Sequence, residues 1–232
     1  VTHIAVNGDF ESAKTTSIQD AAKQHPKVYE ELVCAAALCN DASLDPDREG
    51  EIIGDPTEGA LIHMAQAFGI DHETLEEEYP RVFEQPFDSD RKRMTTVHRM
   101  KNRWTAYTKG AVDEMLPLCT HILTSEGVRP VTETDRANIM KLCLSMSEDA
   151  LRVLGFAMRT LTDLPVSAEE DIESDLIFIG VAGMIDPPRK EVAESVRICR
   201  EAGIRTIMIT GDHRVTALAI ARELDIYREG ST

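Results

Sequence analysis

The 232-residue chain contains 42% hydrophobic residues and carries a formal net charge of −16. This length allows a sizeable buried core and predicts one large domain with a smaller piece attached. The acidic balance argues against nucleic acid as a partner, because phosphate backbones attract basic surfaces, so an anionic ligand would need a locally basic pocket.

Five scattered cysteines, without any Cys-x-x-Cys spacing, favour neither a disulfide framework nor a zinc site. The longest apolar run, residues 176–185, is about half as long as a bilayer-spanning helix, so we expect no segment to insert into a membrane. The sequence opens at Val1 in a strand-like run, residues 2–6, and we expect no signal peptide. We therefore expect a fragment of a longer protein.

Two helices are predicted in the first third of the chain. Residues 26–40 carry apolar side chains at helical spacing. In the second helix Asp55, Pro56 and Glu58 stand where an N-cap, a first-turn proline and a capping-box glutamate belong, and Gly69 would end it. Glu58 is thus a candidate either to satisfy backbone donors or to accept a hydrogen bond from a ligand amine.

A β-hairpin is predicted next, from strand-like runs at residues 94–100 and 104–109. If its turn centres near residues 101–102, the start of the first strand lies beside the end of the second, about 5 Å away. Lys92 and Lys109 then converge at one end of a sheet. Two helical patterns and two strand-like patterns complete the region, at residues 113–118, 132–150, 151–160 and 176–184.

A sharp interruption follows at Asp186-Pro187-Pro188-Arg189, because consecutive prolines fix φ and remove a strand donor. We place a domain boundary here and divide the chain into residues 1–183 and 184–232. The four residues form either a hinge or only a rigid linker.

The second piece is predicted to contain a helix at residues 190–202, a strand at 205–209 and a helix at 213–226. Thr210-Gly211-Asp212 lies between the last two elements, where a hydroxyl, a glycine and a carboxylate can hold phosphate and its metal ion. The alternative is that Asp212 merely caps the last helix. These elements form only part of an α/β sheet.

The most basic segment of this acidic chain is residues 87–94, where Phe87 precedes Arg91, Lys92 and Arg93. An aromatic ring beside cations suits a nucleotide, whose base can stack while its phosphates meet the positive charge. The alternative is a hydrophobic contact followed by the solvated charges of an edge strand.

Two further places are ambiguous by themselves. Lys109 is followed by Gly110, which allows a ligand to approach the backbone closely but also occurs at ordinary turns. Arg152 stands at the start of a predicted strand after a long helix.

Six segments together resemble the cytoplasmic headpiece of P-type cation-transporting ATPases. Their residues are most similar to the calcium-pump-like branch, including its bacterial members. They occur in the order of that family, and their joint match is highly specific, whereas Thr-Gly-Asp alone would be weak. The segments are Gly-Asp-Pro-Thr-Glu-Gly-Ala-Leu, Phe-x-Ser-Asp-Arg-Lys-Arg-Met, Thr-Lys-Gly-Ala, Ala-Leu-Arg, Met-Ile-Asp-Pro-Pro-Arg and Met-Ile-Thr-Gly-Asp, between residues 54 and 212.

The resemblance implies an α/β fold in two parts. Residues 1–183 would be a nucleotide-binding domain with an antiparallel sheet flanked by helices. Residues 184–232 would begin an incomplete, haloacid-dehalogenase-like phosphorylation domain. The expected partners are ATP or ADP and the remaining phosphorylation, actuator and transmembrane domains, on the cytoplasmic face of a membrane-embedded parent.

The same resemblance implies roles for single residues. Adenine would stack on Phe87, Lys92 and Lys109 would line the pocket with Gly110, and Glu58 would lie near the adenine amino group. Arg152 would reach toward the phosphates. The segment Thr210-Gly211-Asp212 would steady the γ-phosphoryl group and Mg²⁺, and residues 186–189 would be the hinge.

Three departures limit what the chain can do. The Asp-Lys-Thr-Gly-Thr segment with the phosphorylated aspartate, the later Gly-Asp-Gly-x-Asn-Asp segment and all transmembrane helices are missing from the sequence. Ser89 stands where some members carry arginine. The parent is expected to be an ATP-driven pump, with Ca²⁺ as its ion, while this chain alone is expected to be inactive and to hold no metal.

Two rival functions come from other classes of protein. A soluble phosphatase of the haloacid-dehalogenase type would use the loop at Thr210, but it needs an aspartyl nucleophile that the sequence does not offer. A cation-binding regulatory module would fit the acidic surface, yet the carboxylates lack the spacing of a calcium loop.

Overall fold

The computed structural model describes residues 1–6, 22–23, 25–48, 50–100, 103–164, 171–185, 190–210 and 214–227. Within these residues one large sheet has the strand order β4-β5-β6-β9-β10-β7-β8, with β1 also paired to β10. Its strands are β1 (His3–Val6), β4 (Arg81–Asp88), β5 (Arg93–Met100), β6 (Arg103–Gly110), β7 (Cys119–Thr124), β8 (Gly127–Pro130), β9 (Leu151–Leu161) and β10 (Leu176–Ile185).

Strand pairing in the large sheet is antiparallel except between β10 and β7. Two strands share the edge of β10 that faces away from β9. The strand β7 pairs with the first residues of β10, and β1 pairs with residues 180–183. The hairpin predicted from the sequence is confirmed as β5 and β6, in full register from Arg93↔Gly110 to Met100↔Arg103. Its predicted turn at residues 101–102 lies outside the described residues.

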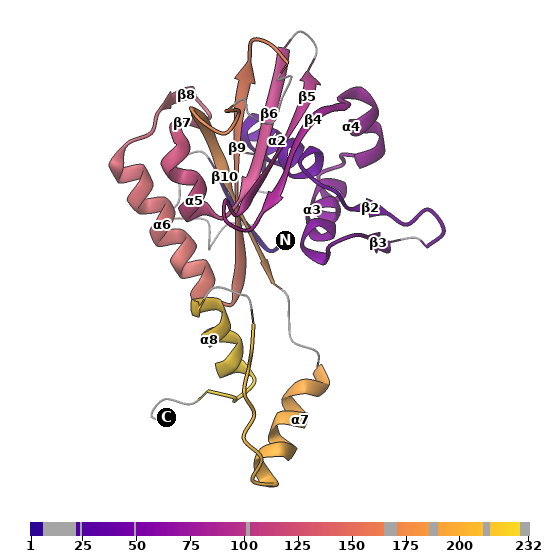
Figure 1. The fold of residues 1–232 in the computed structure, drawn as a ribbon, viewed down its shortest axis with the longest axis vertical. Coiled ribbons are helices and arrows are strands. Elements are labelled where there is room, and N and C mark those ends of the chain that lie inside the picture. Colours follow the sequence, from indigo (N-terminus) through magenta and orange to yellow (C-terminus); the bar gives the residue numbers. More distant parts are fainter. Residues whose placement is uncertain are drawn as a thin grey trace.

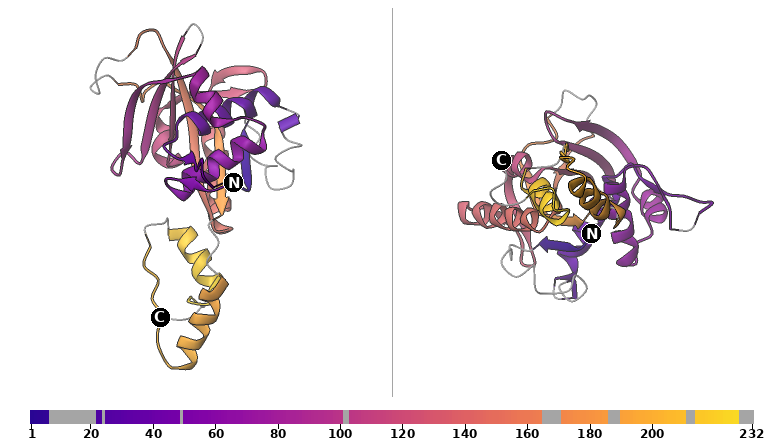
Figure 2. Two further views of the ribbon diagram at one scale, coloured as in Figure 1. Left: turned by 90° about the vertical axis from the view of Figure 1, so that its right-hand side faces the viewer. Right: turned by 90° about the horizontal axis from the view of Figure 1, so that it is seen from below.

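Helices cover both faces of the sheet (Figure 1, Figure 2). On one face lie α2 (Pro26–Leu38), α3 (Pro56–Ala67) and α4 (His72–Glu78), with the short strands β2 (Ser43–Leu44) and β3 (Ile52–Ile53) beside them. On the other lie α5 (Val112–Met115), a 3₁₀ turn (Leu116–Leu118) and α6 (Glu133–Glu148). The prediction of an antiparallel sheet flanked by helices is confirmed.

Alternation along the central strands builds a separate core on each face. Phe156 and Met158 of β9 belong to the core under α2 and α3, whereas Ala157 between them belongs to the core under α5 and α6. Successive strand side chains point to opposite faces, so one strand serves both layers. Against the first face α2 buries Val28, Leu32 and Ala36, as its helical pattern predicts, and also Val33.

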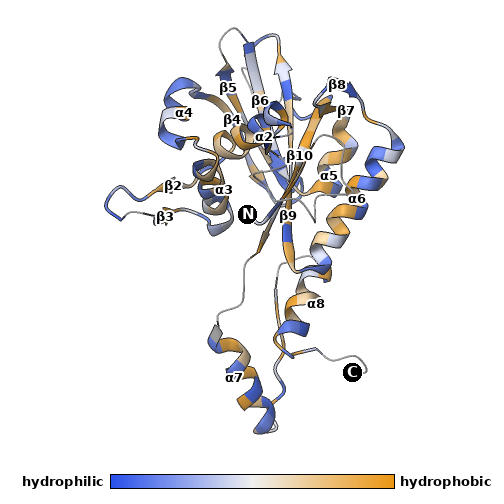
Figure 3. Ribbon diagram, turned by 180° about the vertical axis from the view of Figure 1, so that it is seen from behind, coloured by the Kyte–Doolittle hydropathy of each residue, from blue (hydrophilic) through white to orange (hydrophobic). Residues whose placement is uncertain are grey.

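The C-terminal segment extends beyond one end of the sheet (Figure 2). It contains α7 (Lys190–Glu201), which Figure 3 colours in both hydrophobic and hydrophilic shades, and α8 (Arg214–Glu223). The helix α8 packs near α6, where the Thr216 hydroxyl donates to the Leu151 carbonyl over 3.5 Å. Both helices were predicted.

The predicted strand at residues 205–209 is wrong. These residues form neither helix nor strand, and the side chains of Ile207 and Ile209 are 73% and 93% exposed. An apolar run becomes a strand only when a neighbour satisfies its backbone donors and acceptors. No strand in the described part of the chain pairs with this segment.

The described helices include none that is long and apolar enough to span a bilayer. The strand β10, which contains the longest apolar run of the sequence, is instead buried inside the large sheet.

A buried histidine of β5, bonded to the residue that follows α4, predicts acid sensitivity. His98 donates from Nδ1 to the Tyr79 carbonyl over 2.8 Å, and burial lowers its pKa from 6.5 to about 4. Because the unfolded chain binds this proton more readily, His98 contributes its stability fully above pH 6.5 and loses it as the pH falls toward 4. We expect the unfolding free energy to fall by about 1–2 kcal/mol more between pH 7.5 and 5 than in His98→Gln.

Urea unfolding of both proteins at the two pH values measures this difference. Equal losses in the wild type and in His98→Gln would show that other groups cause the acid sensitivity.

Candidate functional site

Four of the predicted site residues, Phe87, Lys92, Lys109 and Gly110, lie at one end of the sheet, where β4, β5, β6 and β9 are neighbours. Asp88 of β4 pairs with Arg93 of β5, Arg93 pairs with Gly110 of β6, and Gly110 pairs with Gly155 of β9. Phe87 and Lys109 therefore lie two strand spacings apart, about 10 Å between backbones. That span matches the size of a small ligand lying across the sheet end.

Lys109 is the buried cation of this region. Its residue is only 7% exposed, and its ammonium forms a close ion pair with Oε1 of Glu58. The second oxygen of Glu58 accepts from the Asp41 amide over 3.2 Å. A desolvated ion pair of this kind holds both side chains in one geometry and fixes their polar ends at the site.

Helix α3 presents Glu58 from its first turn. Asp55 caps the helix by accepting from the Thr57 amide over 2.8 Å, and Pro56 occupies the first turn, as predicted. The predicted capping box is wrong, because the Glu58 carboxylate turns to Lys109 and Asp41 instead of its own helix. Local capping is completed by Asp55 alone, which leaves Glu58 available for a distant partner.

Two residues behind Glu58 were not predicted from the sequence. The side chain of buried Asn40 donates to the Glu58 carbonyl over 3.1 Å and accepts from the Ala42 amide over 2.9 Å. Arg81 donates to Asp41 Oδ1 over 2.7 Å and also reaches the Asn40 carbonyl. The only local sequence signal for either residue was the polar side chain of Asn40 directly after an apolar helix.

Phe87 is the exposed aromatic of the site, with 64% of its surface accessible. It stands on edge strand β4, just before a turn in which Asp88 Oδ1 accepts from the Asp90 and Arg91 amides, each over 2.9 Å. An exposed ring on a fixed turn offers a flat apolar face to a ligand.

The three adjacent cations do not act together. Arg91 and Arg93 both bind the buried carboxylate of Glu173, at 2.6 Å each. Lys92 instead forms a half-exposed pair with Glu114 at 2.9 Å. Of the basic run, Lys92 alone thus keeps its ammonium at the solvent-exposed surface.

The backbones of the two lysine segments lie side by side, as predicted. The Ala111 amide donates to the Lys92 carbonyl over 3.0 Å, and a Cβ on Gly110 would approach that carbonyl to 2.5 Å. The glycine therefore has a steric reason in the fold itself, since the neighbouring strand fills the space of a side chain.

Arg152 stands near the start of β9 and is exposed. It lies within electrostatic reach of Asp55, whose pKa is lowered although burial alone raises it. Hydrogen bonds from Thr57 and from the Glu58 amide lower this pKa, and so does the charge of Arg152. The charge of Arg152 thus acts on Asp55, the N-cap of α3.

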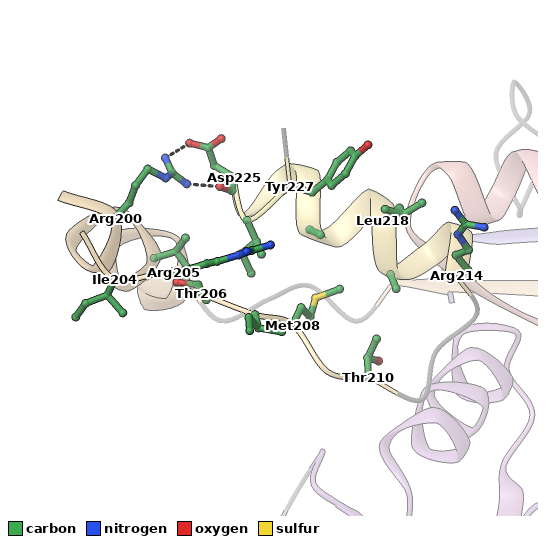
Figure 4. Close-up of a pocket in the computed structure, with 15 residues that line it drawn as sticks. Arg200, Ile204, Arg205, Thr206, Met208, Thr210, Arg214, Leu218, Asp225 and Tyr227 are labelled. Atoms are coloured by element: carbon green, nitrogen blue, oxygen red, sulfur yellow. Dashed lines mark hydrogen bonds and ion pairs between the residues drawn. The ribbon is translucent and has the colours of Figure 1, made fainter. Parts of the chain in front are cut away.

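The other predicted group lies in the C-terminal segment. Thr210 lines a pocket of about 610 Å³ between α7 and α8, and an ion pair between Arg200 and Asp225 stands at its other end (Figure 4). None of the residues around Phe87 and Lys109 lines this pocket. Gly211, Asp212 and the predicted hinge, Asp186, Pro187, Pro188 and Arg189, lie outside the described residues.

Metal-binding groups are not assembled in the part of the chain that the structure describes. No three histidine, cysteine, aspartate or glutamate residues there lie close enough together to hold an ion.

Comparison with known proteins identifies a family. The family model of the P-type ATPase, cytoplasmic domain N, matches residues 28–191. Calcium-transporting ATPase 1 of Bacillus cereus is 42% identical over 226 residues, which cover 97% of this chain and 24% of that protein. Calcium-transporting ATPase 1 of Lactococcus lactis is 39% identical over 199 residues, or 86% of this chain and 22% of that protein.

Cation-transporting ATPase pma1 of Synechocystis is similar in the same way, with 41% identity over 207 residues, 88% of this chain and 22% of that protein. The chain thus spans about a quarter of the length of these curated relatives. Because the match to domain N includes β4, β5, β6 and α3, the residues assembled around Lys109 fall within it. The chain belongs to the P-type ATPase family and contains the cytoplasmic domain N of that family.

Proposed function

We propose that this chain binds ATP or ADP at the sheet end between Phe87 and Lys109, as the nucleotide-binding part of a cation-transporting P-type ATPase. The observation that carries the proposal is the register across β4, β5 and β6. It places the strand with an exposed aromatic residue two strand spacings, about 10 Å between backbones, from the strand with a buried, ion-paired lysine. A nucleotide needs this combination of an apolar face for its base and fixed charge for its polar groups.

Each side chain has a separate task in this proposal. Phe87 stacks on the adenine ring, and the Glu58 carboxylate accepts a hydrogen bond from the adenine amino group. Lys109 and Lys92 contact electron-rich atoms and phosphate oxygens of the nucleotide. Arg152, which is exposed, attracts the terminal phosphates. Gly110 keeps the strands close enough for this arrangement.

The affinity of the site is expected to be modest. One stacking ring and a few cations, partly exposed or already paired, give a net free energy of about 4 to 5 kcal/mol, or a Kd of about 0.1 to 1 mM. Such weak binding suits a domain that must release its nucleotide after each transfer.

The remaining assignments concern the whole pump. Residues 1–183 act as the nucleotide-binding domain, and residues 184–232 begin a phosphorylation domain after a hinge at residues 186–189. Thr210, Gly211 and Asp212 then steady the γ-phosphoryl group and Mg²⁺ against an aspartate supplied by the rest of the protein. The transported ion is Ca²⁺, in keeping with the names of two of the relatives.

Titration of the ¹⁵N-labelled chain with ATP tests this function. We expect the amide signals of Phe87, Lys109 and Gly110 to shift with one common Kd, while the Val128 signal on distant β8 stays in place. Shifts confined to other strands, or none at about 10 mM ATP, ten times the weakest expected Kd, would refute nucleotide binding here.

A further inference from the structure

Glu173 is a buried carboxylate that the proposed nucleotide contacts do not use. Its residue is 5% exposed and lies just before β10, about 80 positions beyond its partners in the chain. Arg91 Nη1 donates to both of its oxygens, over 2.6 and 2.7 Å, and Arg93 Nε donates to Oε2 over 2.6 Å. The Thr95 hydroxyl completes the set by donating to Oε1 over 2.8 Å.

The same network reaches the loop that carries the exposed ring. While Nη1 of Arg91 binds Glu173, its Nη2 donates to the Pro86 carbonyl over 2.6 Å, one residue before Phe87. On the C-terminal side of Phe87, the side-chain carboxylate of Asp88 caps the turn. The backbone carbonyl of Asp88 accepts from the Lys92 amide over 2.6 Å. Phe87 therefore sits between two backbone anchors, one of which depends on Arg91.

We propose that Glu173 is a positioning residue for nucleobase recognition, which fixes Phe87 through Arg91 without touching the nucleotide. The inference rests on the proposed function, because it assigns to Phe87 the stacking of a base. A planar guanidinium held by a carboxylate on one side and a carbonyl on the other has one orientation. Without the carboxylate, Arg91 and the ring must be ordered when the ligand binds, which weakens binding.

A purely structural role makes a different prediction. If Glu173 only ties the segment before β10 to β5 through Arg93 and Thr95, its loss disturbs the sheet end as a whole. Every ligand contact there should then weaken together, including those made by Lys109. Positioning of Phe87 instead affects only ligands that contain a base.

The test therefore compares ATP with inorganic tripolyphosphate, which carries the charge but no base. Both are titrated by NMR into the wild type, Glu173→Gln and Arg91→Gln. Arg91→Gln leaves Glu173 bound to Arg93 and Thr95, so it keeps the test valid should Glu173→Gln not fold. We expect both variants to bind ATP about fivefold more weakly than the wild type, because one more side chain must be ordered on binding. Their affinity for tripolyphosphate should stay within about twofold of the wild-type value.

Asp135 provides the matched control. It is 9% exposed and is bound by both terminal nitrogens of Arg129, over 2.7 and 2.8 Å, at the distant junction of β8 and α6. Asp135→Asn should lower stability and leave ATP affinity unchanged. Unchanged ATP affinity in Glu173→Gln and Arg91→Gln, equal losses for both ligands, or the same loss in Asp135→Asn would overturn the positioning role.

A nucleotide-free measurement separates this inference from the proposed function. If the wild type binds no ATP, the proposed function fails, but the heteronuclear NOE of the Phe87 amide still reports whether Glu173 fixes the loop. We expect this NOE to fall in Glu173→Gln relative to the wild type. An unchanged value would overturn the inference even if ATP binds.

Discussion

Replacing Phe87 by alanine is expected to weaken ATP binding about tenfold or more while the protein stays folded. Stacking of a base on an aromatic side chain contributes about 1 to 3 kcal/mol of binding free energy. In the proposed site Phe87 is the aromatic residue that stacks on the base. Because the ring is 64% exposed, its removal leaves no cavity in either core. The affinity is measured by calorimetric titration and the stability by urea unfolding.

Val128→Ala is the control for this experiment, since Val128 is also an exposed apolar residue on a short edge strand, 48% accessible on β8. It should change neither the affinity nor the unfolding midpoint. ATP binding that survives unchanged in Phe87→Ala would refute the stacking model.

Replacing Lys109 by methionine is expected to destabilise the fold as well as weaken binding. The substitution leaves the Glu58 carboxylate in a mostly buried position without its cation, and breaking such a pair costs about 2 to 4 kcal/mol of unfolding free energy. Converting the partner as well, in Glu58→Gln with Lys109→Met, should recover part of this loss because the unpaired charge disappears. Urea unfolding of the single and double variants measures both effects.

Lys92→Met is the matched control, because it removes the other lysine of the same sheet end. Its pair with Glu114 is half exposed, and exposed pairs contribute little to stability, so the unfolding midpoint should hardly move. Equal destabilisation by the two lysine variants would contradict the distinction between a buried and a surface pair.

Local patterns in the sequence were sufficient for several elements. The strand-like runs at residues 94–100 and 104–109 predicted the hairpin, and the observed register brings Lys92 beside Ala111. The capping residue Asp55 and Pro56 defined the start of α3. Each of these features is determined by neighbours only a few residues apart.

The contacts that shape the site depend on residues far apart, and the sequence did not predict them. Glu58 pairs with Lys109 across 51 positions, and Arg91 with Glu173 across 82. The basic run at residues 91–93 suggested an anion-attracting site, but the charges of Arg91 and Arg93 pair with Glu173 inside the fold. The apolar run at residues 205–209 predicted a strand, yet a strand requires a neighbour that the described residues do not supply.

An intermolecular NOE between bound adenine and the Phe87 ring tests the central claim most directly. With ATP in excess over the ¹³C-labelled chain, we predict cross-peaks from adenine H2 or H8 to the ring protons of Phe87. Cross-peaks from adenine to Met208 or Leu218, which line the pocket between α7 and α8, with none to Phe87, would contradict the account.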